Sequence, residues 1–265
     1  MKQRNLNQDQ LEVLLAIYRF RFCTRSLLAT YLDKPNNTSL YSRIQILKKY
    51  GYLDTRYESS YKLAGREAEY FVTHKAAQVL RRTELIDAPD SALLAVYKDK
   101  TVSDQYVLQL TLMFRFRNIL CAQYDLKWFT GRDIASLDYF PKARPTAFIS
   151  IKVTDHIIRC FVEYIPAGTS ISTIRGKLKQ YSAYFQQDAW GVTDTPFPKI
   201  LYIAEDGMTE QGVRYQIKKE SFRTDTDIEY FTTTKKALLG LQNDTHKIWT
   251  SFDEEELLAL EDIKS

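Results

Sequence analysis

The sequence has few cysteines, glycines and prolines and no long apolar run. Its three cysteines, Cys23, Cys121 and Cys160, are odd in number and far apart, so they fit neither a disulfide framework nor a zinc site. We therefore expect buried free thiols in a reducing compartment. Nine glycines and seven prolines are too few for a linker-rich or fibrous protein. No stretch approaches the ~18 apolar residues of a membrane span, so the sequence predicts a cytoplasmic protein without a membrane partner.

Motifs of common hydrolases and nucleotide-binding enzymes are also missing. No serine lies in a Gly-x-Ser-x-Gly turn, and no Walker or dinucleotide-binding glycine pattern occurs. His74, His156 and His246 lack the spacing of metal ligands and are expected at surface or capping positions. These absences exclude serine hydrolase, ATPase and Rossmann-type functions, and we expect no resident cofactor.

The sequence does contain enough apolar residues for two domains, and its charge is unevenly distributed. The chain has 265 residues, 45% hydrophobic and 26% charged, which suits roughly two cores at about 150 residues each. The net charge of +4 is modest. Residues 1–85, however, hold 15 basic and 8 acidic residues, a net +7, and the 22 basic and 25 acidic residues of 86–265 give −3. The basic end is therefore the part that favours a nucleic-acid partner.

The first 85 residues have the element order of a winged helix-turn-helix domain. The predicted elements are helices after Asn7, after Thr24 and at about 38–50, strands at 52–57 and 69–73, and a closing helix at 74–82. The two strands form the wing, with a basic tip between them. In such a domain the third helix is the recognition helix, which enters the major groove of DNA.

Side chains on the second and third helices and on the wing are the candidate DNA contacts. Cations suit phosphates, whereas tyrosine, serine and amide groups suit base edges. The candidates are Arg25, Tyr41, Ser42, Arg43, Gln45, Lys48, Lys49, Arg56, Lys62 and Arg66. Each one alone is more often a solvated surface residue, and some winged helices bind proteins instead. Together they favour double-stranded DNA.

Residues 86–103 break the pattern and are expected to connect the first domain, 1–85, to a second domain at 104–265. The predicted elements of the second domain are a long apolar helix at 104–124, strands at 126–129, 146–151, 157–164, 199–204 and 228–232, a helix at about 170–187, and an acidic amphipathic helix at 252–260. This order of helices and strands predicts a domain of mixed α and β structure, α/β or α+β, in which helices pack against one sheet. The last helix would dock on its own domain or, alternatively, on another protein.

Several of these segments together resemble the replication-relaxation family of plasmids and integrative elements. Besides the winged helix and the long helix, the resemblance is carried by Arg144-Pro145-Thr146-Ala147-Phe148, Phe161-Val162-Glu163-Tyr164 and Lys177-Leu178-Lys179-Gln180-Tyr181. It covers roughly residues 8–205. The resemblance implies a protein that assists replication, DNA relaxation or mobilisation of a mobile element. It also implies a second domain with the restriction-endonuclease-like mixed sheet, flanked by helices, of PD-(D/E)XK nucleases.

Nucleases of that fold need two carboxylates on a divalent cation and a lysine near the scissile phosphate. Glu163 matches the second acid of the family pattern. Thr146 stands where the first acid is expected, and Ile165 stands where an active nuclease carries lysine. Lys177 on the following helix is the candidate to replace that lysine in space.

We therefore predict an inactive site in which Glu163 is a partly buried acid paired with Lys177 or Arg175. The alternative is a metal-dependent nuclease or nickase that uses Glu163, Lys177, a Mg²⁺ or Mn²⁺ ion and an unmatched acid. The candidates for that acid are Asp133, Asp138 and Asp155.

The leading hypothesis is a non-enzymatic double-stranded DNA-binding accessory protein for replication, relaxation or mobilisation of a plasmid or integrative element. Its winged helix would recognise a DNA site, and its second domain would position a relaxase or a replication protein. A homodimer is compatible with this role. Besides the nuclease, the remaining alternative is a winged-helix transcriptional repressor whose second domain senses a ligand or a partner.

Overall fold

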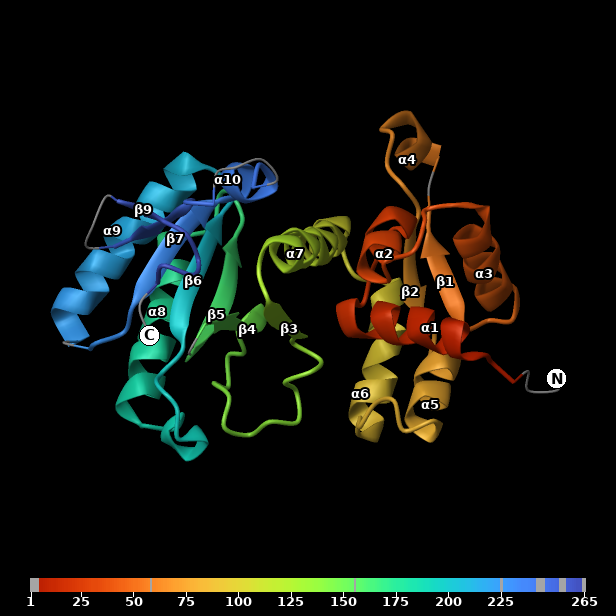
Figure 1. Ribbon diagram of the computed structural model, residues 1–265, viewed down its shortest axis with the longest axis horizontal. Helices are drawn as coiled ribbons and strands as arrows, with labels where there is room; N and C mark the ends of the chain where they lie inside the picture. The colour runs from red at the N-terminus through yellow and green to blue at the C-terminus, as the bar shows by residue number, and fades with distance from the viewer. Residues whose placement is uncertain are drawn as a thin grey trace. The chain divides into compact units, whose positions relative to one another are not determined.

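The chain divides into two compact units, Met1–Asn118 and Ile119–Ser265. The computed structural model describes residues 5–57, 59–154, 156–224, 226–241, 246–252 and 256–263. The first unit combines helices with a two-stranded sheet, and the second contains a mixed seven-stranded sheet with helices (Figure 1). The predicted mixture of α and β structure is confirmed.

The first unit follows the element order expected from the sequence, with three additions. Its elements are α1 Gln8–Phe20, α2 Arg25–Tyr31, α3 Thr38–Lys49, β1 Leu53–Arg56, α4 Ser59–Leu63, β2 Glu69–Val72, α5 His74–Arg82, α6 Asp90–Ala95, the 3₁₀ helix Val96–Lys100 and most of α7, Asp104–Gln123. Strands β1 and β2 are antiparallel, with Thr55 opposite Tyr70. The additions are α4, which lies where a loop was expected between the two strands, and α6 and the 3₁₀ helix, which both lie within the predicted connecting segment.

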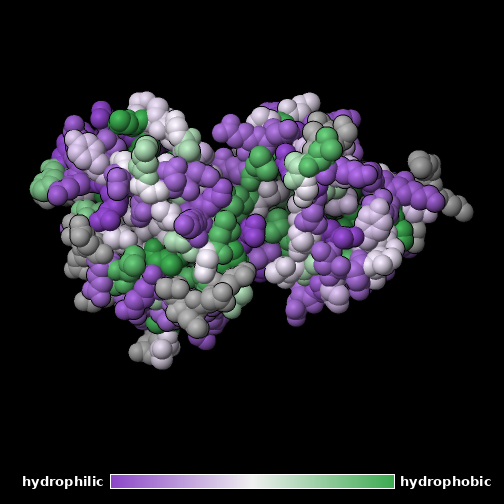
Figure 2. All heavy atoms as spheres, turned by 90° about the horizontal axis from the view of Figure 1, so that it is seen from above, coloured by the Kyte–Doolittle hydropathy of each residue, from purple (hydrophilic) through white to green (hydrophobic). Residues whose placement is uncertain are grey.

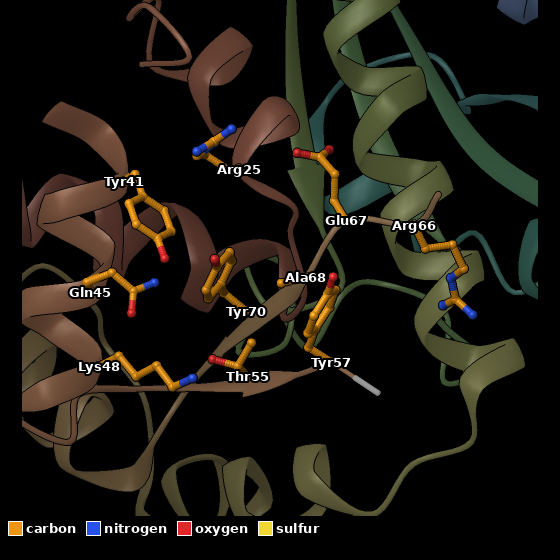
Figure 3. A pocket seen from close by; sticks show the side chains of 10 residues that line it. All are labelled: Arg25, Tyr41, Gln45, Lys48, Thr55, Tyr57, Arg66, Glu67, Ala68 and Tyr70. Atoms are coloured by element: carbon orange, nitrogen blue, oxygen red, sulfur yellow. The ribbon is translucent and has the colours of Figure 1, made fainter. Parts of the chain in front are cut away.

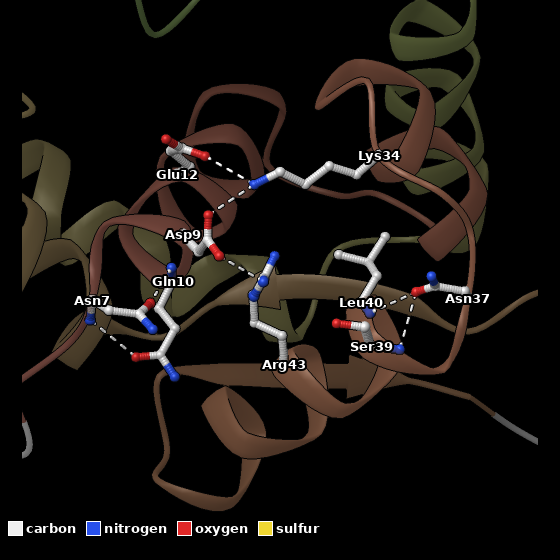
Figure 4. Close-up of polar contacts among 9 residues, drawn as sticks. All are labelled: Asn7, Asp9, Gln10, Glu12, Lys34, Asn37, Ser39, Leu40 and Arg43. Atoms are coloured by element: carbon white, nitrogen blue, oxygen red, sulfur yellow. Dashed lines mark hydrogen bonds and ion pairs between the residues drawn. The ribbon is translucent and has the colours of Figure 1, made fainter.

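Local capping explains where the helices of the first unit begin. Asn7 forms a capping box with Gln10 at the start of α1, and Thr24 and Thr73 accept backbone hydrogen bonds at the starts of α2 and α5. At α3, the Asn37 side chain accepts hydrogen bonds from the backbone amides of Ser39 at 3.0 Å and Leu40 at 3.2 Å (Figure 4). These caps orient α3 relative to the turn that precedes it.

The division between the units falls inside α7 rather than in the predicted connecting segment 86–103. The first turns of α7 pack within the first unit: the ring of Phe114 stacks on Phe20 at 3.8 Å, and the Asn118 amide donates to the carbonyl of Leu27 at 3.0 Å. The connecting segment itself contributes Leu93 and Val96, both buried. The segment therefore belongs to a core, because its apolar residues pack despite its turn-forming composition.

The second unit is built on one sheet with strand order β3-β4-β5-β6-β7-β8-β9. Its elements are β3 Leu126–Thr130, β4 Ala147–Val153, β5 His156–Ile165, α8 Ile171–Gln186, the 3₁₀ helix Gly191–Thr193, β6 Lys199–Ala204, α9 Gly207–Thr224, β7 Tyr230–Thr234, α10 Lys235–Leu239, β8 Trp249–Ser251 and β9 Leu257–Leu258. The pairs β5–β6 and β6–β7 are parallel, and the other pairs are antiparallel.

The core of the second unit lies between the sheet and helices α8 and α9. Every residue of β6 is buried, as expected for a parallel strand between two neighbours and covered on its faces. Phe161 of β5, Tyr202 of β6, Leu178 of α8 and Ile217 of α9 belong to one hydrophobic cluster. This packing fixes β5 and α8 against each other, and both carry residues of the candidate site.

The prediction of an acidic helix at 252–260 is wrong. Leu257 and Leu258 form β9, which pairs with β8 so that Leu258 lies opposite Trp249. The buried Leu260 follows the strand, and residues 253–255 lie outside the described part. A short leucine-rich run fits a strand as well as a helix, and here it extends the sheet at its edge.

The thiols are placed mainly as expected. Cys23 is buried in the first unit, where its backbone bridges to Tyr70, and Cys160 is buried on β5 in the second unit. Cys121 is partly buried. Burial raises the pKa of both buried thiols far above the usual value.

Candidate nucleic-acid interface and the Glu163 cluster

Helix α3 presents a polar outer face. It buries Leu40, Ile44 and Leu47 against the first unit, and this spacing turns Tyr41, Ser42 and Lys48 outward, where all three are exposed. Tyr41, Gln45 and Lys48 are spaced by four and three residues, so they share one side of the helix.

That side of α3 forms one wall of a surface pocket of about 410 Å³, which we call the α3 pocket (Figure 3). Tyr41, Gln45 and Lys48 line it on the helix side, and Thr55, Tyr57 and Tyr70 line it on the sheet side. In Figure 3 the ring of Tyr70 lies between those of Tyr41 and Tyr57. Tyr41 is 43% exposed and Tyr57 52% exposed, whereas Tyr70 is buried. Burial raises the pKa of Tyr70, so its hydroxyl is neutral at physiological pH.

Two polar atoms in the pocket walls have unmet hydrogen-bonding capacity. Arg25, the first residue of α2, holds its guanidinium 5.5 Å from the centre of the Tyr41 ring. Its Nε and the hydroxyl of Thr55 are buried and have no hydrogen-bond partner in the described part of the chain. A buried polar atom without a partner costs about 1–3 kcal/mol.

The charges around the α3 pocket are mainly positive. Arg25, Lys48 and Arg66 line it together with one acid, Glu67, whose carboxylate accepts a hydrogen bond from the Ser26 hydroxyl. Among the described residues no acid forms an ion pair with Arg25 or Lys48. These two cations are therefore available to an external anion.

Three other predicted contacts are held by acids of the first unit. Arg43 turns toward α1, where its guanidinium lies 2.7 Å from a carboxylate oxygen of Asp9 (Figure 4). A hydrogen bond from Lys34 and the charge of Arg43 lower the pKa of Asp9. Arg56 pairs with Asp104, and Arg66 pairs with Glu69 at 2.8 Å while stacking over the ring of Tyr61.

The structure thus gathers part of the predicted set and separates the rest. The α3 pocket is lined by five of the predicted residues: Arg25, Tyr41, Gln45, Lys48 and Arg66. Ser42, Lys49 and Lys62 are exposed but do not line it. Sequence reasoning missed the sheet side of the pocket. The signal for it was the two-residue spacing of Thr55 in β1 and Tyr57 directly after it, because extended backbone turns side chains two residues apart to the same face.

In the second unit, Glu163 of β5 is the centre of a buried polar cluster. It is 4% exposed. Its Oε1 accepts from Lys177 Nζ at 2.9 Å and from the Tyr181 hydroxyl, and its Oε2 accepts from the Thr146 hydroxyl at 3.0 Å. Lys177 and Tyr181 are four residues apart on α8, so both reach the carboxylate from one side of that helix. Lys177 also donates to the carbonyl of Arg144 at 3.1 Å.

Residues of the protein itself balance the charge of the Glu163 carboxylate and donate hydrogen bonds to its oxygens. Burial and the nearby carboxylate raise the pKa of Tyr181 well above its usual value, so the tyrosine remains a hydrogen-bond donor. Burial likewise raises the pKa of Tyr202. Arg175, the other predicted partner, lies near the amide of Gln216 instead.

These residues do not fit a divalent cation. Mg²⁺ and Mn²⁺ require several oxygen ligands with little competition from donors. Ile165 offers no ligand, and the Thr146 hydroxyl donates to the only acid of the cluster. Asp133 accepts from the backbone and hydroxyl of Thr130, and Asp155 lies outside the described residues. Within the described ranges, no group of three or more His, Cys, Asp or Glu could hold a metal ion.

Within the described ranges, no helix combines the length and apolarity needed to cross a bilayer. Figure 2 shows mainly hydrophilic residues over the face drawn, with hydrophobic ones in separate patches.

Comparison with known proteins gives one family match. The model of the replication-relaxation family matches residues 14–200. No curated protein matches the chain. Among solved structures, the restriction endonuclease FokI is similar over 99% of this chain and 48% of that one, with 12% sequence identity and a TM-score of 0.36. The chain therefore spans about half the length of that protein.

Proposed function

Because the chain belongs to the replication-relaxation family, we propose that it is a non-enzymatic accessory protein that binds double-stranded DNA during replication, relaxation or mobilisation of a plasmid or integrative element. The first unit acts as the winged helix, with α3 toward the DNA. The family fits a role related to replication and relaxation. The observation that carries the DNA-binding proposal is the pair of cations, Arg25 and Lys48, beside the exposed polar face of α3.

The charge argument depends on which cations are free of internal acids. A cation that displaces counterions from a phosphate must not already be neutralised. Arg43, Arg56 and Arg66 each have a carboxylate partner, whereas Arg25 and Lys48 have none in the described part of the chain. Lys49 of α3 and Lys62 of α4 are further exposed cations of the first unit.

The Glu163 cluster supports a non-catalytic role for the second unit. A carboxylate that accepts from Lys177, Tyr181 and Thr146 has little remaining capacity for a metal ion. We propose that this unit positions a relaxase or a replication protein, and that a homodimer is compatible with its use at a symmetric DNA site.

DNA binding is tested by fluorescence anisotropy of a labelled duplex at several salt concentrations. Lys48→Ala and Arg25→Ala should each weaken binding roughly tenfold and reduce the slope of log K against log salt by about 1. The matched control is Arg82→Ala, which removes an exposed cation from α5. Equal affinities and slopes for wild type, Lys48→Ala and Arg25→Ala would refute this assignment.

Absence of nuclease activity is tested with supercoiled plasmid and Mg²⁺ or Mn²⁺. We expect no nicking by the wild-type protein. Nicking that Glu163→Gln abolishes would replace the proposal with the nuclease alternative.

A further inference from the structure

We infer that the α3 pocket holds one unpaired nucleotide of a DNA strand, with its base between the tyrosines and its phosphate on the cations. The inference rests on the proposed function, because it assumes that this side of the first unit faces DNA. It goes further by assigning a ligand to the recess and by predicting a preference among DNA structures.

The shape of the pocket is the first reason. The bases of an intact duplex are stacked, so a protein reaches only their edges, from side chains that project into a groove. The α3 pocket is a recess of about 410 Å³ between a helix and a sheet, within the size range of small-molecule sites. A base edge held in the duplex does not enter such a recess, whereas a base turned out of the stack does.

The aromatic residues are the second reason. Tyr41 and Tyr57 are both half-exposed and line opposite walls, and buried Tyr70 lies between them (Figure 3). Exposed tyrosine rings around a recess provide faces on which a base can stack, whatever its identity. Stacking needs an unstacked base, so it favours unpaired over paired nucleotides.

The polar atoms are the third reason. Gln45 has an amide that both donates to and accepts from a base edge. Arg25 Nε needs an acceptor, and the buried Thr55 hydroxyl has no partner in the described part of the chain. Lys48 is exposed at the rim. A nucleotide offers phosphate oxygens to the cations of Arg25 and Lys48, and base atoms to the amide of Gln45.

The test compares three duplexes of one sequence by fluorescence anisotropy with the full chain. The first is fully paired, the second carries one extra unpaired nucleotide, and the third carries the same extra nucleotide without its base. We expect the second to bind about tenfold more tightly than the first, the value of one stacked base. The third should lose that advantage although it bends as easily as the second.

Variants connect the advantage to the pocket. Tyr41→Ala should remove the preference for the unpaired nucleotide, and Tyr41→Phe should keep it, because the ring alone stacks. Lys48→Ala should weaken all three duplexes together. Circular dichroism checks that Tyr41→Ala remains folded, which its exposure favours.

The outcomes separate this inference from the proposed function. Equal affinity for the paired and the unpaired duplex, with the Lys48→Ala effect intact, overturns the nucleotide site and leaves duplex binding in place. An advantage that persists without the base overturns it as well, because it reports bending instead of stacking. Failure to bind any of the three duplexes overturns both proposals.

Discussion

Replacing Lys177 with methionine should destabilise the second unit, because it removes the only cation paired with the buried Glu163 carboxylate in the described part of the chain. Methionine keeps an unbranched apolar chain in place of the lysine stem. Breaking one side of a buried ion pair costs about 3–5 kcal/mol. The side chain of Lys177 is 23% exposed, and Glu163 keeps the hydroxyl donors of Tyr181 and Thr146. We therefore expect a smaller loss, about 2–3 kcal/mol.

The assay is urea unfolding followed by tryptophan fluorescence. All three tryptophans, Trp128, Trp190 and Trp249, lie in the second unit, so their emission reports that unit alone. At a slope of about 2 kcal/mol per molar urea, the midpoint should fall by about 1 M. Lys179→Met, an exposed lysine on the same helix, is the matched control and should shift stability by less than about 0.5 kcal/mol.

A double-mutant cycle separates pairing from other effects of the substitution. Glu163→Gln removes the charge that Lys177 balances, so adding it to Lys177→Met should restore about 1–2 kcal/mol. An unchanged midpoint for Lys177→Met, or fully additive losses, would refute the account of a carboxylate satisfied by the protein. So would a rise in melting temperature with Mg²⁺ in the wild type that is absent from Glu163→Gln.

The remaining predictions concern pH, charge and capping. Burial raises the pKa of Tyr202 far above its unfolded value. The neutral hydroxyl of the folded state therefore costs no stability below about pH 10, and the protein loses stability as the pH rises above that value and the unfolded tyrosine ionises. Tyr202→Phe removes this ionisation and should shift the alkaline midpoint of unfolding, measured by fluorescence, to higher pH. The Tyr202 hydroxyl has no partner in the described part of the chain, so the same variant should cost little at neutral pH. Arg43→Ala should reduce DNA affinity less than Lys48→Ala in anisotropy, because Arg43 is held by Asp9; an equal loss would contradict this. Asn37→Ala should destabilise the first unit by about 1 kcal/mol in urea unfolding followed by near-ultraviolet circular dichroism, and Asn37→Asp should retain the cap.

The pairing of Glu163 with Lys177 could be predicted because the two residues fall on neighbouring elements and an unpaired buried acid is costly. The two further hydrogen-bond donors to that carboxylate, Tyr181 and Thr146, could not be predicted. Tyr181 reads as a core residue from its helical spacing, and Thr146 reads only as a missing acid. Their hydroxyls reach Glu163 because β4, β5 and α8 pack together, which no local pattern specifies.

The sequence did not predict helix α9, because the apolar residues of this helix do not coincide with its buried side. It buries Gln216 and Glu220 beside Val213 and Ile217, while Met208 and Phe222 are more than four-fifths exposed. Its polar buried residues are accommodated through hydrogen bonds, such as that between Glu220 and Arg223. Periodicity of apolar residues therefore gives no clear helical signal here.

The residues on the sheet side of the α3 pocket could not be predicted because their positions depend on strand pairing. Arg25, Tyr41, Gln45 and Lys48 are close in sequence and on helices whose faces can be drawn from spacing. Thr55 and Tyr70 face each other only through the register of β1 and β2. That register follows from the turn and helix between the strands, where α4 replaces a short loop.

Each unit contains one completely buried cysteine whose rate of chemical modification can report on the opening of that unit. Cys23 reports on the first unit and Cys160 on the second, and both are completely buried. Because burial raises the pKa of each thiol, alkylation at neutral pH requires local opening that exposes and ionises the sulfur. With the partly buried Cys121 replaced by serine, the rate at which each remaining cysteine is modified measures how often its own unit opens. Adding DNA should then slow the modification of Cys23 and leave that of Cys160 unchanged, if the first unit alone holds the duplex.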